Sequence, residues 1–293
     1  MQEIGNKIIN SPDTIIDESF SHKDRREFDL FIFINDEQLE LTAWSSGDHV
    51  LYALERYSLQ GLQNLSDTSV FQDILNQSKL AKNANEYHSR FVFSGLRNVT
   101  MIPNALFMAD ELDLQHSFSA PTSDNSRVFT DELRIADARS IYSLPKELDM
   151  NLRNLFGHFD LFHASTALIE SQLLSNRNKN EHTFCVIIYD SYFELLVVNG
   201  RQLLLYNTFD IENSESLLYY CLFCCEQLGL NPESVHVELA GAIDSASQSY
   251  SNLERYFRNI SFGDKESDTK ISYRFQESPS HRFYPALNFP ACV

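Results

Sequence analysis

Two stretches of the chain share one order of apolar and polar positions. Residues 30–41 read LFIFINDEQLEL and residues 184–195 read FCVIIYDSYFEL. Each is an apolar run followed by Asp, two residues, a large apolar residue and Glu-Leu, so that Asp36 corresponds to Asp190. The separation between the copies is far longer than the ~20–50 residues of solenoid repeats. The pattern therefore predicts two similar domains in one chain.

Each copy begins with three strands that are expected to form an antiparallel meander, and continues into a helix and a further strand. In the first copy, turn residues at Asn35-Asp36-Glu37 join the first and second strands as a hairpin. In the second copy, Asn199-Gly200 joins the second and third strands. In the first copy the predicted elements are strands 28–35, 38–44 and 49–58, helix 67–82 and strand 90–95. In the second copy they are strands 183–190, 192–198 and 201–210, helix 214–228, strand 234–240, helix 245–257 and a short strand at 260–262. Helix 214–228 is apolar nearly all round, so we expect it to be buried.

The rest of the chain predicts additional elements around these two cores. Between the copies we expect a helix at 105–114, an exposed polar loop at 117–126, strands at 128–133 and 138–144, a helix at 146–156, a strand at 159–163 and a helix at 164–174. The aromatic tail, residues 281–293, is expected to pack against the fold. An antiparallel meander joined through helices to parallel strands indicates an α/β class with mixed sheets. We expect a lead-in at 1–24, a first lobe at 25–165 and a second lobe at 166–293.

Composition narrows the classes of partner. The 293 residues include 23 Lys+Arg and 41 Asp+Glu, giving a net charge of −18. Nucleic acid would be repelled, because binding to its backbone needs a basic surface. No apolar run reaches the ~18 residues of a membrane span. The first residues lack the pattern of a signal peptide, and the five cysteines lack the spacing of a disulfide framework. We therefore expect a cytoplasmic protein.

Candidate chemistry is sparse. Only nine glycines occur, and no Walker-type or dinucleotide-binding motif is present. The segment from His158 to His163 contains three side chains that could bind a metal, but no second cluster completes a site. No Gly-x-Ser-x-Gly elbow occurs. We expect neither a metal site nor catalytic residues.

The duplicated pattern resembles the actin-like ATPase fold, a ribonuclease H-like fold shared by sugar kinases, Hsp70 chaperones and actin. The chain also resembles an uncharacterised bacterial family of unknown function that is assigned to this fold. The resemblance rests on the turns at Asp36 and Asp190, the Gly-terminated strands at Gly95 and Gly241, and the tail at 283–289.

The resemblance implies a nucleotide cleft, and this chain departs from its motifs. In active members the first hairpin of each domain reads Asp-x-Gly, and its amides bind phosphates. Here Gln38 and Tyr192 stand where those glycines would be, and Glu37 adds a negative charge. Of the two glycines on the adenosine side, only Gly241 remains. The resemblance thus implies a vestigial cleft at Asp36, Asp190 and Gly241.

Two hypotheses about function follow. The first is a non-catalytic binding or scaffold protein whose partner is another protein and which uses neither ATP nor Mg²⁺. The alternative is an ATP-binding or ATP-hydrolysing member with diverged phosphate loops, for which Gly241 is the motivation. Neither the identity of a partner nor the oligomeric state follows from the sequence.

Overall fold

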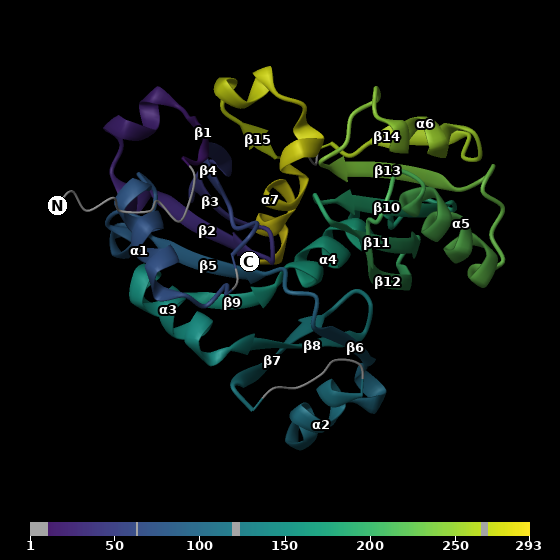
Figure 1. Ribbon diagram of the computed structural model, residues 1–293, viewed down its shortest axis with the longest axis horizontal. Helices are drawn as coiled ribbons and strands as arrows, with labels where there is room; N and C mark the ends of the chain where they lie inside the picture. The colour runs from purple at the N-terminus through teal and green to yellow at the C-terminus, as the bar shows by residue number, and fades with distance from the viewer. Residues whose placement is uncertain (1–10, 63, 119–123, 265–268) are drawn as a thin grey trace. The chain divides into compact units, whose positions relative to one another are not determined.

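The computed structural model describes residues 11–62, 64–118, 124–264 and 269–293. The chain divides into two compact units, each with its own sheet (Figure 1). Unit 1 comprises the chain up to Glu132 with Arg139–Ala164 and Thr269–Glu277. Unit 2 comprises Leu133–Ala138, Ser165–Asp268 and Ser278–Val293.

The main sheet of unit 1 begins with the predicted meander. Its strands lie in the order β1-β4-β3-β2-β5-β9, with the short β15 beside β4. The antiparallel strands are β1 (Asp13–Ile16), β2 (Phe28–Ile34), β3 (Gln38–Ser45) and β4 (Val50–Ser58), and the others are β5 (Ser89–Ser94), β9 (Asp160–His163) and β15 (Lys270–Ile271). β5 is parallel to β2, and β9 is parallel to β5. Residues 13–16 of the lead-in thus belong to the sheet rather than preceding it.

Two helices of unit 1 bury the apolar side chains of β2. They are α1 (Thr68–Gln77) and α3 (Lys146–Phe156). The Asp67 side chain accepts a hydrogen bond from the Ser69 amide and so caps α1, as its turn chemistry predicts. Apolar residues from both helices lie in one core with alternate residues of β2.

A second, smaller sheet in unit 1 consists of β6 (Val99–Pro103), β8 (Ala138–Pro145) and β7 (Ser126–Leu133), in the order β6-β8-β7. The helix expected at 105–114 is wrong, because short 3₁₀ turns precede α2 (Leu112–Ser117). Met108 is extended, and the Gln115 side chain accepts from its amide and donates to the Leu106 carbonyl. A side chain thus satisfies backbone groups that a helix would have paired. Within the polar loop expected at 117–126, residues 119–123 lie outside the described residues.

The sheet of unit 2 repeats the strand order of unit 1. Its strands are β10 (His182–Ile188), β11 (Tyr192–Asn199), β12 (Gln202–Asp210), β13 (His236–Gly241) and β14 (Asn259–Phe262). Their order is β12-β11-β10-β13-β14, which matches β4-β3-β2-β5-β9 strand for strand. β10, β13 and β14 are parallel, and β10, β11 and β12 form the meander.

Helices cover both faces of the unit 2 sheet. α5 (Ser216–Leu228) and α6 (Gln248–Glu254) contribute to the core with Phe184, Val186 and Leu195. On the opposite face lie α4 (Ala164–Asn176) and α7 (Tyr284–Asn288), where Gln172 and Tyr284 both bond to Glu238 of β13. The aromatic tail is buried, as expected.

Candidate functional site

The hairpin of Asp36 lies at the carboxyl end of β2 in unit 1. The Asn35 amide donates to the Gln38 carbonyl at 3.0 Å, which closes the turn. The Asn35 side-chain oxygen accepts from the Glu37 amide at 2.9 Å and from the Gln38 amide at 2.8 Å. Asn35 is fully buried, whereas Asp36 is exposed. Two turn amides that could bind an anion are therefore already bonded to a neighbouring side chain.

Arg97 brings a positive charge to this turn. It follows the end of β5, and its Nε lies 3.4 Å from a carboxylate oxygen of Asp36. Because β5 is parallel to β2, their carboxyl ends meet at the same edge of the sheet. The ion pair is partly exposed, so its contribution to stability is small.

The hairpin of Asp190 lies at the corresponding place in unit 2. Asp190 and Ser191 are exposed between β10 and β11, and the Tyr189 amide donates to the Tyr192 carbonyl at 2.9 Å. The Tyr192 side chain is only 1% exposed and stacks on Tyr189, with ring centroids 4.5 Å apart. The residue at the missing glycine position is therefore part of the packed interior.

Gly241 has a structural requirement of its own. It ends β13 opposite Ile188 of β10, with φ of +85°. A Cβ added here would lie 2.1 Å from the Ile188 carbonyl oxygen, and that oxygen accepts from the Ala242 amide at 2.8 Å. Only glycine allows this approach between two backbones. Gly241 and Asp190 thus lie at the same edge of the sheet, whereas Asp36 belongs to unit 1.

The turns at this edge of unit 2 carry negative charge. Residues 188–192, 209–212 and 241–246 contain the acidic side chains Asp190, Asp210, Glu212 and Asp244 and contain neither Lys nor Arg. A polyphosphate would meet like charges there, which oppose its binding.

The repeated glutamates of the two copies are buried in different environments. Glu40 of β3 accepts from Arg56 Nε at 2.7 Å, so its carboxylate is paired with a cation. Glu194 of β11 accepts instead from the hydroxyls of Tyr189, at 3.2 Å, and Tyr206, at 3.1 Å. Burial raises the pKa of Glu194 to about 7, and the two hydroxyl bonds only partly offset this.

Sequence reasoning missed the roles of Asn35, Arg97 and Glu194. A signal for Glu194 was present, because an acid between Phe193 and Leu195 in a strand flanked by apolar strands has few routes to water. The roles of Asn35 and Arg97 depend on contacts across a turn and between strands, which spacing alone does not specify.

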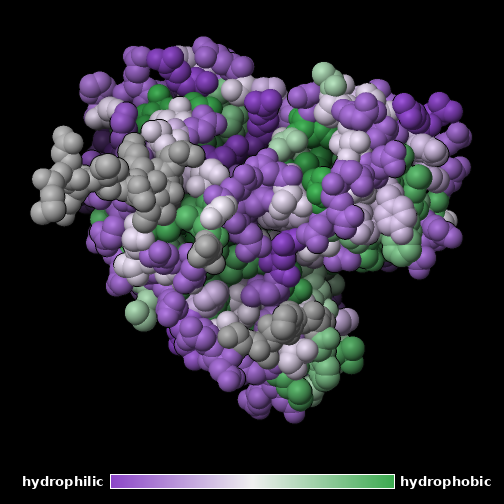
Figure 2. Space-filling view, in the orientation of Figure 1, coloured by the Kyte–Doolittle hydropathy of each residue, from purple (hydrophilic) through white to green (hydrophobic). Residues whose placement is uncertain are grey.

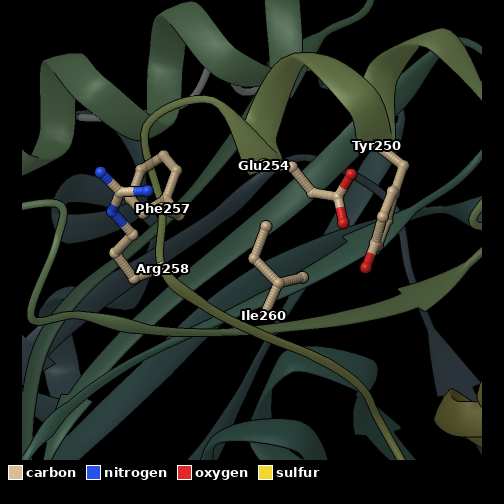
Figure 3. Close-up of a pocket in the computed structure, with 5 residues that line it drawn as sticks. All are labelled: Tyr250, Glu254, Phe257, Arg258 and Ile260. Atoms are coloured by element: carbon tan, nitrogen blue, oxygen red, sulfur yellow. The ribbon is translucent and has the colours of Figure 1, made fainter.

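A shallow depression of about 210 Å³ lies between α6 and β14. Figure 3 shows Tyr250 and Glu254 on one side, Phe257 and Arg258 on the other, and Ile260 between them. The volume is below the ~300–1,000 Å³ of usual small-molecule sites. We assign no ligand to it.

The three possible metal ligands between His158 and His163 differ in environment, because His158 and Asp160 are exposed and His163 is buried. His163 is buried, and its Nε2 lies 2.9 Å from the Leu96 carbonyl oxygen. Burial lowers the pKa of His163 to about 4, so its ring is neutral at pH 7 and donates this bond. Across the described residues, no three His, Cys, Asp or Glu side chains come together as a metal site. Within the same residues, no helix has the length and hydrophobicity to cross a membrane.

Comparison with known protein families shows which family the chain belongs to. A family model described as a protein of unknown function, DUF3822, matches residues 17–260. The chain belongs to the DUF3822 family. No curated protein matches the chain.

Solved structures identify the fold of this DUF3822 member. A protein from Bacteroides thetaiotaomicron, described as having an actin-like ATPase fold and unknown function, matches with a TM-score of 0.73 and 18% identity, over 86% of this chain and 95% of that one. The PilM–PilN type IV pilus biogenesis complex matches with a TM-score of 0.62 and 13% identity, over 91% of this chain and 98% of that one. The fold is therefore the actin-like ATPase fold, as the resemblance implied.

Proposed function

We propose that the protein is a non-catalytic member of the actin-like fold that holds another protein and does not turn over ATP. The observation that carries this proposal is the closed hairpin of unit 1. Asn35 already occupies the Glu37 and Gln38 amides. To bind phosphate, these two amides would have to give up their hydrogen bonds to Asn35. The Glu37 carboxylate in the same turn would also repel the phosphate.

Unit 2 supports the same reading through charge and packing. Its edge carries four acidic residues in three turns, and Tyr192 is packed into the interior. Gly241, the remaining glycine of the adenosine motif, is explained by its contact with Ile188. The residues at the edge of each unit are therefore explained by packing and hydrogen bonding, without a bound nucleotide.

A protein partner fits the remaining observations. One of the similar solved structures is described as a complex of PilM with PilN, so a protein of this fold is found bound to another protein in that structure. The net charge of −18 argues against nucleic acid as the partner. The five free cysteines suit a reducing compartment, and we propose a cytoplasmic location. The shared strand order of the two sheets suits a duplication.

The alternative is an ATPase with diverged loops. It is favoured by the exposure of Asp36 and Asp190 at the carboxyl ends of parallel strands, where α/β folds bind ligands. Turnover would then depend on these carboxylates placing a magnesium ion.

Steady-state phosphate release separates the two functions. With purified full-length protein, millimolar ATP and Mg²⁺, we expect release no faster than that of the buffer, and the same rate for Asp190→Ala. Turnover above background that is lost in Asp190→Ala would contradict our proposal and establish the ATPase. Turnover that persists in this variant and in Asp36→Ala would indicate a contaminating enzyme, which further purification removes.

A further inference from the structure

Helix α5 of unit 2 presents aromatic side chains to solvent, although its sequence predicts a buried helix. Tyr219 is 62% exposed and Phe223 is 42% exposed. They lie one helical turn apart, and their rings are stacked with centroids 6.4 Å apart. In Figure 2 apolar residues gather at the right of the view, where Figure 1 places α5.

The exposed pair continues an aromatic row. Tyr220 stands edge-on to Tyr219, at 5.1 Å between centroids, and stacks on Phe209 of β12 at 4.3 Å. We call Phe209, Tyr220, Tyr219 and Phe223 the aromatic row. Because Tyr220 and Phe209 are themselves packed on Phe193 of the core, the row stands on a rigid base.

The outer face of α5 carries two aromatic rings where a solvated helix usually carries polar side chains. A helix at the surface of a soluble domain normally has an apolar stripe toward the core and a polar face toward water. In α5 the buried face holds Leu217, Cys221 and Cys225, yet the opposite face holds Tyr219 and Phe223. Two large rings at helical spacing on the solvent face match the anchors that a helix partner packs against.

The chain segment that contains the row has only acidic side chains among its charged residues. Residues 202–232 include Asp210, Glu212, Glu215 and Glu226 and no Lys, Arg or His. Glu215, the residue directly before α5, and Glu226 within α5 are both exposed, and along the chain they flank the aromatic pair. Arg258, which lies between α6 and β14, is paired with Glu233 at 3.3 Å.

This charge pattern selects among the possible occupants. A second copy of the chain would bring acidic residues against acidic residues, in addition to the repulsion between two chains of net charge −18. A segment with Lys or Arg beside apolar anchors would instead pair with Glu215 and Glu226, and arginine also stacks on exposed aromatic faces.

From this geometry we propose that the α5 face binds a basic amphipathic helix of another protein. Its apolar side chains pack on Tyr219 and Phe223, and its Lys or Arg side chains face Glu215 and Glu226. The inference rests on the proposed function, because it names the surface and the chemistry of the partner that the protein holds.

A peptide-display selection tests this surface without a known partner. A random-peptide library is panned on the full-length wild-type chain and, separately, on Tyr219→Ala/Phe223→Ala. We expect peptides that are enriched on the wild type and lost on the double variant, with a net positive charge and apolar residues at three- and four-residue spacing. Their synthetic forms should bind the double variant at least tenfold more weakly, which corresponds to about 1.4 kcal/mol.

A second variant and a control make the result decisive. Glu215→Lys/Glu226→Lys keeps both rings and should weaken binding of the same peptides, whereas Phe118→Ala removes an exposed ring of unit 1 and should leave it unchanged. Circular dichroism and melting curves confirm that each variant is folded.

Four results would overturn the inference. Selected peptides that are acidic or neutral would show the wrong partner chemistry. A dimer in light scattering that Tyr219→Ala/Phe223→Ala abolishes would show that a second copy occupies the face. Peptides that bind both forms equally would place protein binding elsewhere and leave the proposed function intact, whereas enrichment on neither form would count against both.

Discussion

Gly241→Ala is expected to destabilise unit 2 by about 3 kcal/mol or more, because the new Cβ meets backbone rather than a movable side chain. The Cβ would lie 2.1 Å from the Ile188 carbonyl oxygen and 3.0 Å from the carbonyl carbon and the amide nitrogen of the same residue. Relief requires β13 to move away from β10 at its carboxyl end, where Ile188 also accepts from Ala242. Chemical denaturation followed by circular dichroism measures the loss.

Gly229→Ala is the matched control for backbone strain. Gly229 also has positive φ, at +66°, but it has no atom within 4 Å of the added Cβ. Its substitution should cost only about 1–2 kcal/mol, the usual cost of a left-handed non-glycine residue. Equal losses for the two variants would show that the contact with Ile188 adds nothing, and Gly241 would again need a functional explanation.

Glu194→Gln is expected to change how the stability of the protein depends on pH. The pKa of Glu194 is raised from 4.5 to about 7 by burial, so the folded state holds a proton that the unfolded state releases between these values. Stability from this group is therefore fully present below about pH 4.5 and is lost as pH rises toward 7. Gln is neutral throughout and can keep bonds to Tyr189 and Tyr206.

Subtracting the unfolding free energy of the wild type from that of Glu194→Gln at each pH isolates the effect of Glu194, because the other carboxyls are the same in both proteins. As pH rises from 4.5 to 8, the free energy of unfolding of Glu194→Gln minus that of the wild type should increase by an amount on the order of 3 kcal/mol. A difference that stays constant over this range would show that the carboxyl has an ordinary pKa. Glu194→Leu serves as the control: it also removes the titrating carboxyl but leaves the hydroxyls of Tyr189 and Tyr206 without this acceptor, so it should be less stable than Glu194→Gln at every pH.

The strand framework could be predicted from the sequence because apolar runs and turn residues act locally. The meanders at 28–58 and 183–210 follow from apolar runs broken by Asn35-Asp36 and Asn199-Gly200, and helix α3 follows directly after Pro145. The helix expected at 105–114 failed because the side chain of Gln115 bonds to backbone groups of residues 106 and 108. Hydrogen bonds from a side chain to the backbone do not change the spacing of apolar residues, so the sequence pattern does not reveal them.

Prediction of the site was limited for a different reason. The sequence showed that Gln38 and Tyr192 replace glycines, but not that Asn35 closes the turn amides or that Tyr192 stacks inward on Tyr189. It also predicted burial of α5 from composition, whereas exposure of Tyr219 depends on what covers the helix in the folded protein. Side-chain direction and tertiary cover are not encoded in spacing.

Thermal denaturation of the full-length protein with and without millimolar ATP and Mg²⁺ tests the central claim most directly. A site half-saturated at one hundredth of the ATP concentration would stabilise the fold by about 2.7 kcal/mol. For a chain of this size that shift in melting temperature is roughly 5 °C. We predict no shift for the wild type and none for Asp36→Ala/Asp190→Ala. A shift in the wild type that the double variant loses would show that the hairpins still bind nucleotide and would contradict this account.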